Sequence, residues 1–358
     1  MSRLLGIQYL RAAAALGVVI FHAAERAGGH FVIGAAGVDV FFVISGFIMW
    51  VLAEMRQPAP ATFLRDRIER IVPLYWIVTA IMVAGALAGL FPSIRLTVGH
   101  VIGSLMFVPH ISPSNGQIWP LLVQGWTLNY ELFFYAVFAA VLMLAASKRL
   151  PAIAAIFAAL VIAGLLLQPQ APVFKTYTSP LLLEFLMGIC VGKLWLERRM
   201  PSARTGLALM IVALGGFAFV AITYIGFNAF ILGPLASLLL IGVLAVEASG
   251  HMPRSNTAAY LGDASYSIYL WHTMAISVVA KFGMLLSLPP LAVFAIATLS
   301  GTAIGVAAYE MLEKPITAFL KKRRRRQRQT IPVLADHLHR RVSCEGFPEG
   351  AVKQDRPR

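Results

Sequence analysis

The first polar pair that could do chemistry lies in the first apolar segment of the chain. Arg11 and His22 are eleven residues apart. On an α-helix, at about 100° per residue, this spacing is three turns plus about 20°, so both side chains project from nearly the same face, about 16 Å apart along the axis. Arginine can hold an anionic carrier and histidine is the usual general base near neutral pH. A snorkelling arginine and a histidine satisfied by neighbouring helices is the structural alternative.

Three further charged positions could serve the same chemistry from neighbouring segments. Asp39 lies near the start of the second apolar segment, where it could orient His22 and stabilise its charged form. Arg67 and Arg70 are spaced i,i+3, on one face of a helical turn, just before Pro73, which can start a helix. Guanidinium groups bind phosphates well, so this pair predicts a docking site for a phosphate-rich carrier such as coenzyme A.

Later segments carry polar residues at helical spacing. Glu131 is expected near the outer face, where it could place an acceptor substrate or remain in the headgroup zone. Tyr269 and His272 are i,i+3 and share a face near mid-membrane, which makes them candidates for substrate binding. Glu310 and Glu313 have the same spacing, and we expect them to pair structurally with basic inner loops.

The composition shows what kind of scaffold must position these residues. Of 358 residues, 59% are hydrophobic and 13% are charged, and the mean hydropathy is +0.77. These values exclude a water-soluble globular enzyme, a disordered chain and a coiled coil. They fit an all-α, polytopic integral membrane bundle, at about 20 apolar residues per helical span.

The apolar runs predict about ten transmembrane helices. The segment from Val98 to Pro109 is too short to span and is expected to be re-entrant or interfacial. The ten runs lie at about 5–24, 33–53, 72–91, 125–147, 151–167, 180–197, 205–223, 229–247, 264–284 and 290–319.

The positive charges predict the orientation of these helices. The formal net charge is +14, and most basic residues fall in alternate loops and in the C-terminal tail. Because cytoplasmic loops retain Lys and Arg, we expect both termini to be cytoplasmic and do not expect a nucleic-acid partner. Arg11 within the first run argues against a cleaved signal peptide.

The chain is expected to divide into two regions. Residues 1–320 form the transmembrane domain, and residues 321–358 form a basic cytoplasmic tail without an apolar period. Such a tail is expected to be disordered, or attracted to the anionic headgroups of membrane lipids. The two cysteines, Cys190 and Cys344, have no metal-ligand or disulfide spacing, so no metal is expected.

Several of these motifs, in this order, resemble the membrane acyltransferase-3 family, and particularly its exopolysaccharide O-acetyltransferase (ExoZ-like) branch. The resemblance covers about residues 4–320. The segments that carry it are Ile7–Arg11 with His22, Gly37–Phe47, Arg67–Pro73, Trp126–Leu128 with Glu131, Ser265–Leu270 with His272, and Tyr309–Glu310 with Glu313 and Pro315.

The resemblance implies a ten-helix membrane enzyme that takes acyl groups from cytoplasmic acyl-CoA, with acetyl-CoA as the expected donor. The positive-inside loops and the absence of alternating strands of the outer-membrane type predict the bacterial inner membrane as its location. The acceptors it implies are hydroxyls of a surface polysaccharide or its lipid-linked precursor. The family's essential arginine and histidine fall on Arg11 and His22. Direct transfer and a covalent acyl-histidine intermediate both stay open.

A protein of another class would also carry ionisable residues within its spans. A secondary transporter or glycan exporter without acyl transfer is the main alternative. Such proteins more often show inverted repeats and broken helices, and the sequence has no clear internal repeat. A non-catalytic membrane scaffold is the third alternative, but it would not require Arg11 and His22 on one face.

Overall fold

The structure is a computed structural model that describes residues 4–223 and 226–324, and all regular secondary structure within these ranges is helical. This confirms the all-α prediction. The N-terminal half contains α1 Leu5–Arg26, η1 Val32–Ala36, α2 Gly37–Arg56, α3 Pro60–Leu87, α4 Val98–Leu105, α5 Gly125–Val141 and α6 Ala146–Leu167. The C-terminal half contains α7 Pro172–Tyr177, α8 Leu182–Leu196, α9 Ala203–Thr223, α10 Ala229–Ala248, α11 Asn256–Leu285, α12 Pro290–Ala308 and η2 Tyr309–Glu313.

Nine helices in the described residues are long and apolar enough to cross a membrane. They correspond to nine of the ten predicted spans. The tenth, predicted at 125–147, is α5, which has 17 residues and ends at Val141. The chain turns there, and α6 takes up Lys148 and Arg149 in its first turns. The short segment beginning at Val98 forms α4, of 8 residues.

Helix α3 begins earlier than the apolar pattern predicts, and this difference matters for the site. The run predicted at 72–91 is preceded by a charged stretch that is also helical, so α3 starts at Pro60. An i,i+4 ion pair between Arg65 and Glu69 (3.9 Å) lies within that stretch. Arg67 and Arg70 are therefore mounted on a continuous helix.

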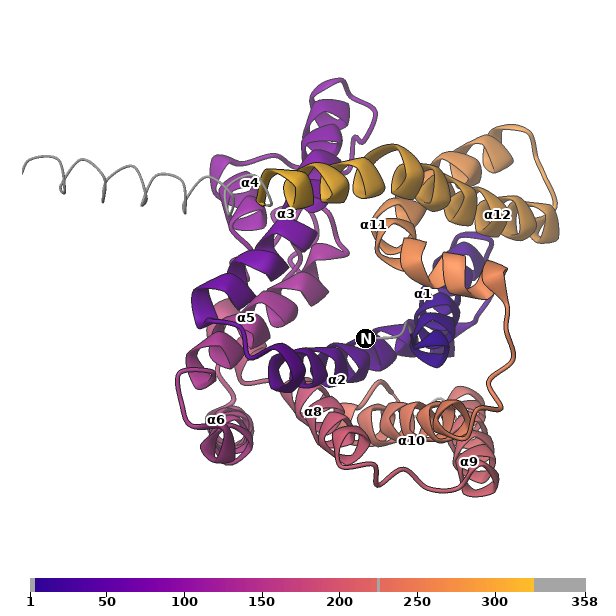
Figure 1. Ribbon diagram of the computed structural model, residues 1–358. Coiled ribbons are helices and arrows are strands. Elements are labelled where there is room, and N and C mark those ends of the chain that lie inside the picture. The colour runs from indigo at the N-terminus through magenta and orange to yellow at the C-terminus, as the bar shows by residue number, and fades with distance from the viewer. Residues whose placement is uncertain (1–3, 224–225, 325–358) are drawn as a thin grey trace, which may run out of the picture. The chain divides into compact units, whose positions relative to one another are not determined.

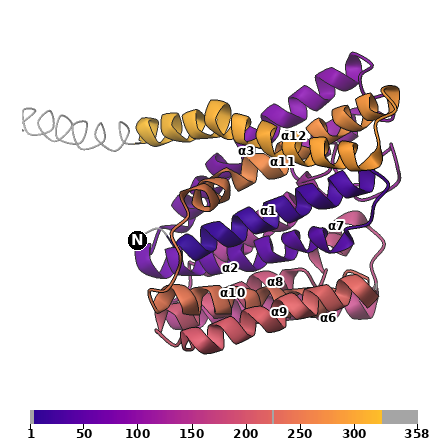
Figure 2. The same cartoon turned by 90° about the vertical axis from the view of Figure 1, so that its right-hand side faces the viewer.

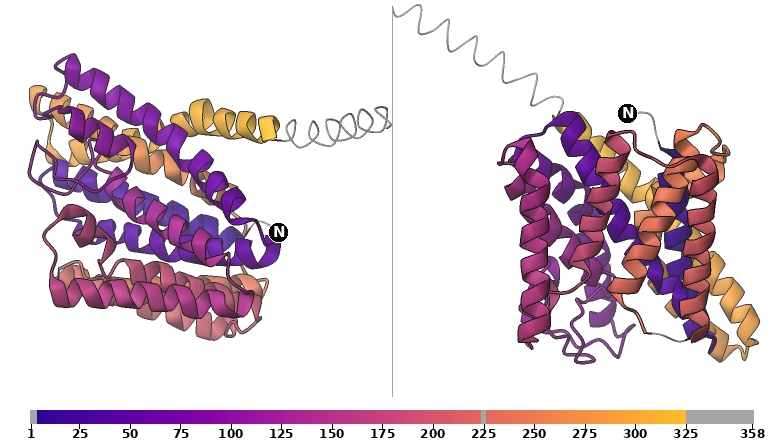
Figure 3. Two further views of the ribbon diagram at one scale, coloured as in Figure 1. Left: turned by 90° about the vertical axis from the view of Figure 1, so that its left-hand side faces the viewer. Right: turned by 90° about the horizontal axis from the view of Figure 1, so that it is seen from below.

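The helices of the first structural unit, which ends at Glu313, pack closely in pairs. The closest pairs are α11 with α12, α1 with α11, α2 with α8, and α9 with α10. Figure 1 shows α1, α2, α3, α5 and α11 arranged around a common central region. Figures 2 and 3 show α1, α2, α9 and α10 running along one direction.

A second unit begins at Lys314. Its described part, residues 314–324, is helical. The predicted disorder of the basic tail concerns residues that, beyond 324, lie outside the described part of the chain. The predicted boundary at residue 320 stays a prediction.

Small residues allow α2 and α8 to approach backbone to backbone. A Cβ atom added at Gly46 would lie 2.0 Å from the carbonyl oxygen of Phe185, and one at Gly188 would lie 1.9 Å from that of Val43. No side chain fits in that space. The packing role expected for small residues in the Gly37–Phe47 segment is thus what the structure shows at Gly46.

We therefore expect Gly46→Ala or Gly188→Ala to destabilise the α2–α8 contact by about 1–3 kcal/mol, the usual range for overpacking. The measurement is the midpoint of thermal unfolding of the purified protein in detergent. Gly215→Ala in α9 is the control, because no atom lies within 4 Å of a Cβ added there. Equal midpoints for all three variants would contradict this account of the contact.

Candidate functional site

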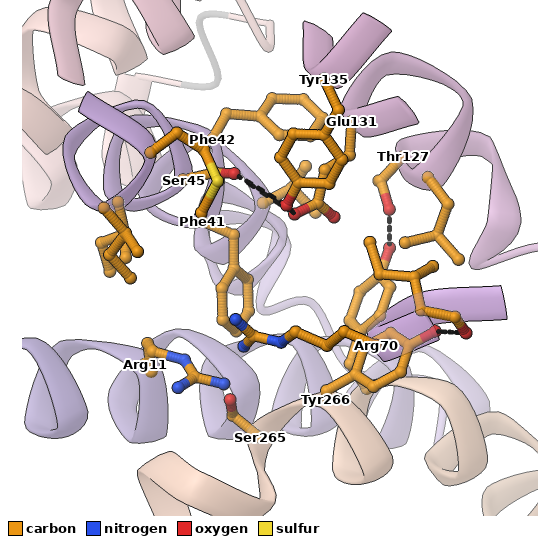
Figure 4. Close-up of a pocket in the computed structure, with 17 residues that line it drawn as sticks. Arg11, Phe41, Phe42, Ser45, Arg70, Thr127, Glu131, Tyr135, Ser265 and Tyr266 are labelled. Atoms are coloured by element: carbon orange, nitrogen blue, oxygen red, sulfur yellow. Dashed lines mark hydrogen bonds between the residues drawn. The ribbon is translucent and has the colours of Figure 1, made fainter. Parts of the chain in front are cut away.

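An inner cavity of about 90 Å³ lies between α1, α2, α3, α5 and α11, and its lining residues are drawn in Figure 4. Most of the surface of this cavity is apolar, and side chains of α2 contribute most of that apolar surface. Its polar lining consists of Arg11, Ser45, Arg70, Thr127, Glu131, Tyr135, Ser265, Tyr266 and Tyr269. Five helices thus contribute to one polar site inside an apolar bundle.

Two guanidinium groups meet at this inner cavity. Figure 4 shows the guanidinium of Arg70, from α3, turned toward that of Arg11, from α1, with the Ser265 hydroxyl beside Arg11. Arg11 Nη1 donates a hydrogen bond to Gln8 Oε1 at 3.2 Å. Because the two cations repel each other and both face the cavity, an anionic ligand between them would lower the electrostatic energy.

Carboxylates surround the two cations. Glu313, Asp263 and Glu131 all lie within electrostatic range of Arg11. Glu313 also accepts a hydrogen bond from the Ser267 hydroxyl at 2.6 Å. It belongs to η2, a π-helical turn, and such turns are frequent at functional sites. The expected pairing of Glu313 with basic inner loops stays untested, but its surroundings include the cavity arginines.

Arg67 is placed differently from Arg70. Its guanidinium lies over the ring of Phe63, 6.0 Å from the ring centroid, and is not among the described groups that line the inner cavity. Its Nε atom is buried and has no hydrogen-bond partner within residues 4–223 and 226–324. Glu131 and Tyr135 are within its electrostatic range. Arg70 therefore lines the cavity, whereas Arg67 packs over Phe63.

Glu131 lies on the inner cavity with the arginines. It accepts hydrogen bonds from the Tyr135 hydroxyl and from the Ser45 hydroxyl, the latter at 3.2 Å. The sequence pattern predicts an outer position near the acceptor, whereas the structure places this carboxylate beside Arg11 and Arg70. The reason is that the helix α5 crosses next to α2, whose Ser45 binds the carboxylate.

His22 lies on a second, outer cavity of about 780 Å³. Asp39, Glu25, Gln124 and Tyr269 also line it. The other lining residues include the aromatic side chains of Phe21, Trp119, Trp126, Phe227 and Phe230. A histidine among aromatic faces and carboxyl groups suits a polyhydroxylated ligand with apolar faces better than an anion.

The carboxylate that contacts His22 is Glu25, one turn further along the same helix. His22 Nδ1 is 3.5 Å from Glu25 Oε2. Asp39 shares the outer cavity with His22, but it faces the buried carboxyl group of Glu184. Asp39 and His22 therefore line the same cavity, but the carboxylate that contacts His22 is that of Glu25.

His272 and Tyr269 also occupy different positions, although they share a helix face. His272 is fully buried, its ring centroid lies 5.2 Å from that of His22, and its Nδ1 donates to the Ile268 carbonyl oxygen at 3.1 Å. Its Nε2 is buried without a partner among the described groups. Tyr269 lines both cavities. Tyr269 is thus positioned to touch a substrate, and His272 contacts His22.

Three polar residues at the site were not singled out from the sequence. Glu25 follows His22 at i,i+3, a spacing that pairs helical side chains. Glu184 is a carboxyl group inside an apolar run, which is itself a signal for function. Gln124 precedes α5, and its amide nitrogen donates to the Thr273 hydroxyl. Only the first two carried a signal that could have found them.

The model of the acyltransferase-3 family, described as an acyltransferase domain, matches residues 4–310. This chain belongs to that family. It is a multi-pass membrane acyltransferase, and no cluster of three or more His, Cys, Asp or Glu side chains suited to a metal occurs in the residues that the structure describes.

Three relatives illustrate the range of similarity. The exopolysaccharide production protein ExoZ of Rhizobium meliloti is 55% identical over 298 residues, which is 83% of this chain and 94% of that protein. BcsY of Komagataeibacter xylinus, a candidate membrane-bound transacylase, is 30% identical over 77% of this chain and 73% of its own length. A candidate O-acetyltransferase of Staphylococcus aureus is 23% identical, and the match spans 51% of that protein. No solved structure matches the chain.

These findings favour the enzyme over the other two classes of protein. The family and the names of the transacylase and O-acetyltransferase relatives describe group transfer. None of these names describes a transporter, an exporter or a scaffold.

We expect Glu25→Gln to lower acyl transfer about tenfold, because the neutral amide no longer stabilises the charged form of His22. Glu197→Gln is the control, because Glu197 pairs with Lys193 and Arg199 away from both cavities. An unchanged rate in Glu25→Gln would show that Glu25 has no part in positioning His22.

Proposed function

We propose that this protein is a membrane O-acyltransferase that moves an acyl group from cytoplasmic acyl-CoA to a hydroxyl of an exopolysaccharide or its lipid-linked precursor. The donor proposed is acetyl-CoA, and the location is the bacterial inner membrane. The observation that carries the proposal is the separation of Arg11 and Arg70, on the inner cavity, from His22 on the outer one. Donor binding at Arg11 and proton removal at His22 are thus separated along α1.

The charge distribution supports the orientation in which both termini are cytoplasmic. Arg70 and the N-terminal end of α1 then face the side where acyl-CoA is made, and His22 faces outward. The arginine side is the natural side for the donor, since coenzyme A carries several phosphate charges. The aromatic outer cavity is then left for the glycan.

The inner cavity would hold the donor through its charged groups. Arg70 is solvent-exposed on α3, so it can meet the phosphates at the membrane surface. Arg11 is half-buried on α1 and lines the same cavity, where it can steer the donor inward. Arg67 packs against Phe63 and so stabilises the helical turn that carries Arg70.

The chemistry requires a base at the acceptor hydroxyl. The C–S bond of the thioester breaks and a C–O bond to the sugar oxygen forms. The hydroxyl proton passes to His22 and finally to the coenzyme A sulfur, so that atoms and charge balance. Glu25 and Asp39 line the same outer cavity and can accept hydrogen bonds from neighbouring sugar hydroxyls. Transfer can be direct, or it can pass through an acyl group on the His22 ring.

The names of the relatives support the acceptor class. ExoZ is an exopolysaccharide production protein, and the match covers almost its whole length. The S. aureus relatives support acetyl as the group transferred, through their description as candidate O-acetyltransferases. A polysaccharide also fits an outer cavity rich in aromatic side chains.

The experiment is an assay of acetyl-CoA use in proteoliposomes, with surface polysaccharide stripped of its O-acetyl groups as acceptor. Arg70→Gln should raise the KM for acetyl-CoA about tenfold or more, because one charge-assisted phosphate contact contributes about 1.5–3 kcal/mol. The KM for polysaccharide should stay unchanged, since Arg70 does not line the outer cavity among the described residues.

Arg65→Gln is the matched control on the same helix. Arg65 pairs with Glu69 and does not line the inner cavity in the described structure. A wild-type KM for acetyl-CoA in Arg70→Gln, or an equal increase in Arg65→Gln, would contradict the donor site. No transfer by the wild-type protein from any acyl-CoA would overturn the proposed function.

A further inference from the structure

The inner and outer cavities share a wall made of side chains. In the described parts of the chain, Val38 and Tyr269 are the two residues that line both cavities. Arg11 and Arg70 line the inner cavity alone, and His22 lines the outer side. An acyl group delivered at the arginines therefore has to cross this wall before it reaches His22 or an acceptor.

Tyr269 is held across this boundary by hydrogen bonds. Its hydroxyl lies 3.0 Å from Thr127 Oγ1 and donates to the Gln124 carbonyl oxygen at 3.3 Å. Thr127 lines the inner cavity and Gln124 lines the outer one, so the Tyr269 hydroxyl contacts one residue from each cavity. The edge of the ring meets Phe41, with ring centroids 6.1 Å apart. Tyr269 is buried.

These contacts hold the Tyr269 ring between the two cavities, in a position from which the ring can rotate away. Both cavities are lined by the Tyr269 side chain, so a rotation of its ring away from the shared wall would open a path between them. The rotation breaks two neutral hydrogen bonds of the Tyr269 hydroxyl, and the binding of a ligand can compensate for their loss. Closed, the wall keeps water of the outer cavity from the donor thioester.

We propose that Tyr269 and Val38 form the gate through which the acyl group passes, and that their size limits the length of the acyl chain transferred. This inference rests on the proposed function and adds the two side chains that select the acyl donor by the length of its chain. A two-carbon acyl group can pass through a narrow opening beside the Tyr269 ring, whereas a longer chain must displace the ring from the shared wall.

The test compares acetyl-, propionyl-, butyryl- and hexanoyl-CoA in the proteoliposome assay, with O-deacetylated polysaccharide as acceptor. The wild-type protein should transfer acetyl far better than butyryl. Tyr269→Ala should raise the butyryl-to-acetyl ratio at least tenfold. It should also release coenzyme A without acceptor, as water takes the place of the sugar hydroxyl and the products are the free carboxylate and the thiol.

Tyr269→Phe separates the closing of the gate from its size. It keeps the ring but loses both hydrogen bonds, so acceptor-free release of coenzyme A should rise while the chain preference stays that of the wild type. Leu128→Ala is the matched control, because Leu128 lines the inner cavity but not the wall. It should enlarge the inner cavity and leave the chain preference unchanged.

Each outcome separates this inference from the proposed function. A wild-type protein that transfers no acyl group overturns the proposed function. A wild-type protein that uses butyryl-CoA as well as acetyl-CoA overturns the gate alone, as does a folded Tyr269→Ala variant that transfers acetyl with an unchanged chain preference. If Leu128→Ala broadens the preference as much as Tyr269→Ala does, cavity volume and not the wall selects the donor. Should Tyr269→Ala fail to accumulate, Val38→Ala carries the same test.

Discussion

The constraint on which the rest of the structure depends is the cationic side chain of Arg11 within an apolar bundle, which meets a second cation, Arg70, at the inner cavity. A cation in partly apolar surroundings is destabilised by a second cation unless anions lie close to it. The negative charge near Arg11 comes from three other segments, through Glu131, Asp263 and Glu313. The packing of α1 against α11 and the early start of α3 are what bring these charges together.

Helix α1 links this charged centre to the place of the proposed chemistry. Arg11 lies on the inner cavity and His22 on the outer one, so one rigid element spans both. A rigid helix fixes the separation between anion binding and proton removal, which loops would do less well. What remains adjustable is the side-chain wall at Tyr269, and a small movement there would decide when the two cavities communicate.

The fold and the main residues could be predicted because membrane burial leaves strong signals. Apolar runs set the helices, and ionisable residues within them marked Arg11 and His22. Which residues meet across helices could not be predicted, because periodicity says nothing about neighbours. Glu131 thus lies with the arginines rather than near His22, and the acidic neighbour of His22 is Glu25. The apolar pattern places the start of α3 too late because a charged stretch extends the helix N-terminally to Pro60.

The most direct test is the O-acetyl content of purified surface polysaccharide, measured by NMR, in a deletion strain complemented with wild type or His22→Ala at equal membrane level. We expect deletion to remove the O-acetyl groups, the wild-type protein to restore them and His22→Ala to leave them absent. Full restoration by His22→Ala would contradict the central role of His22. Unchanged acylation with loss of polymer from the surface would instead identify an exporter.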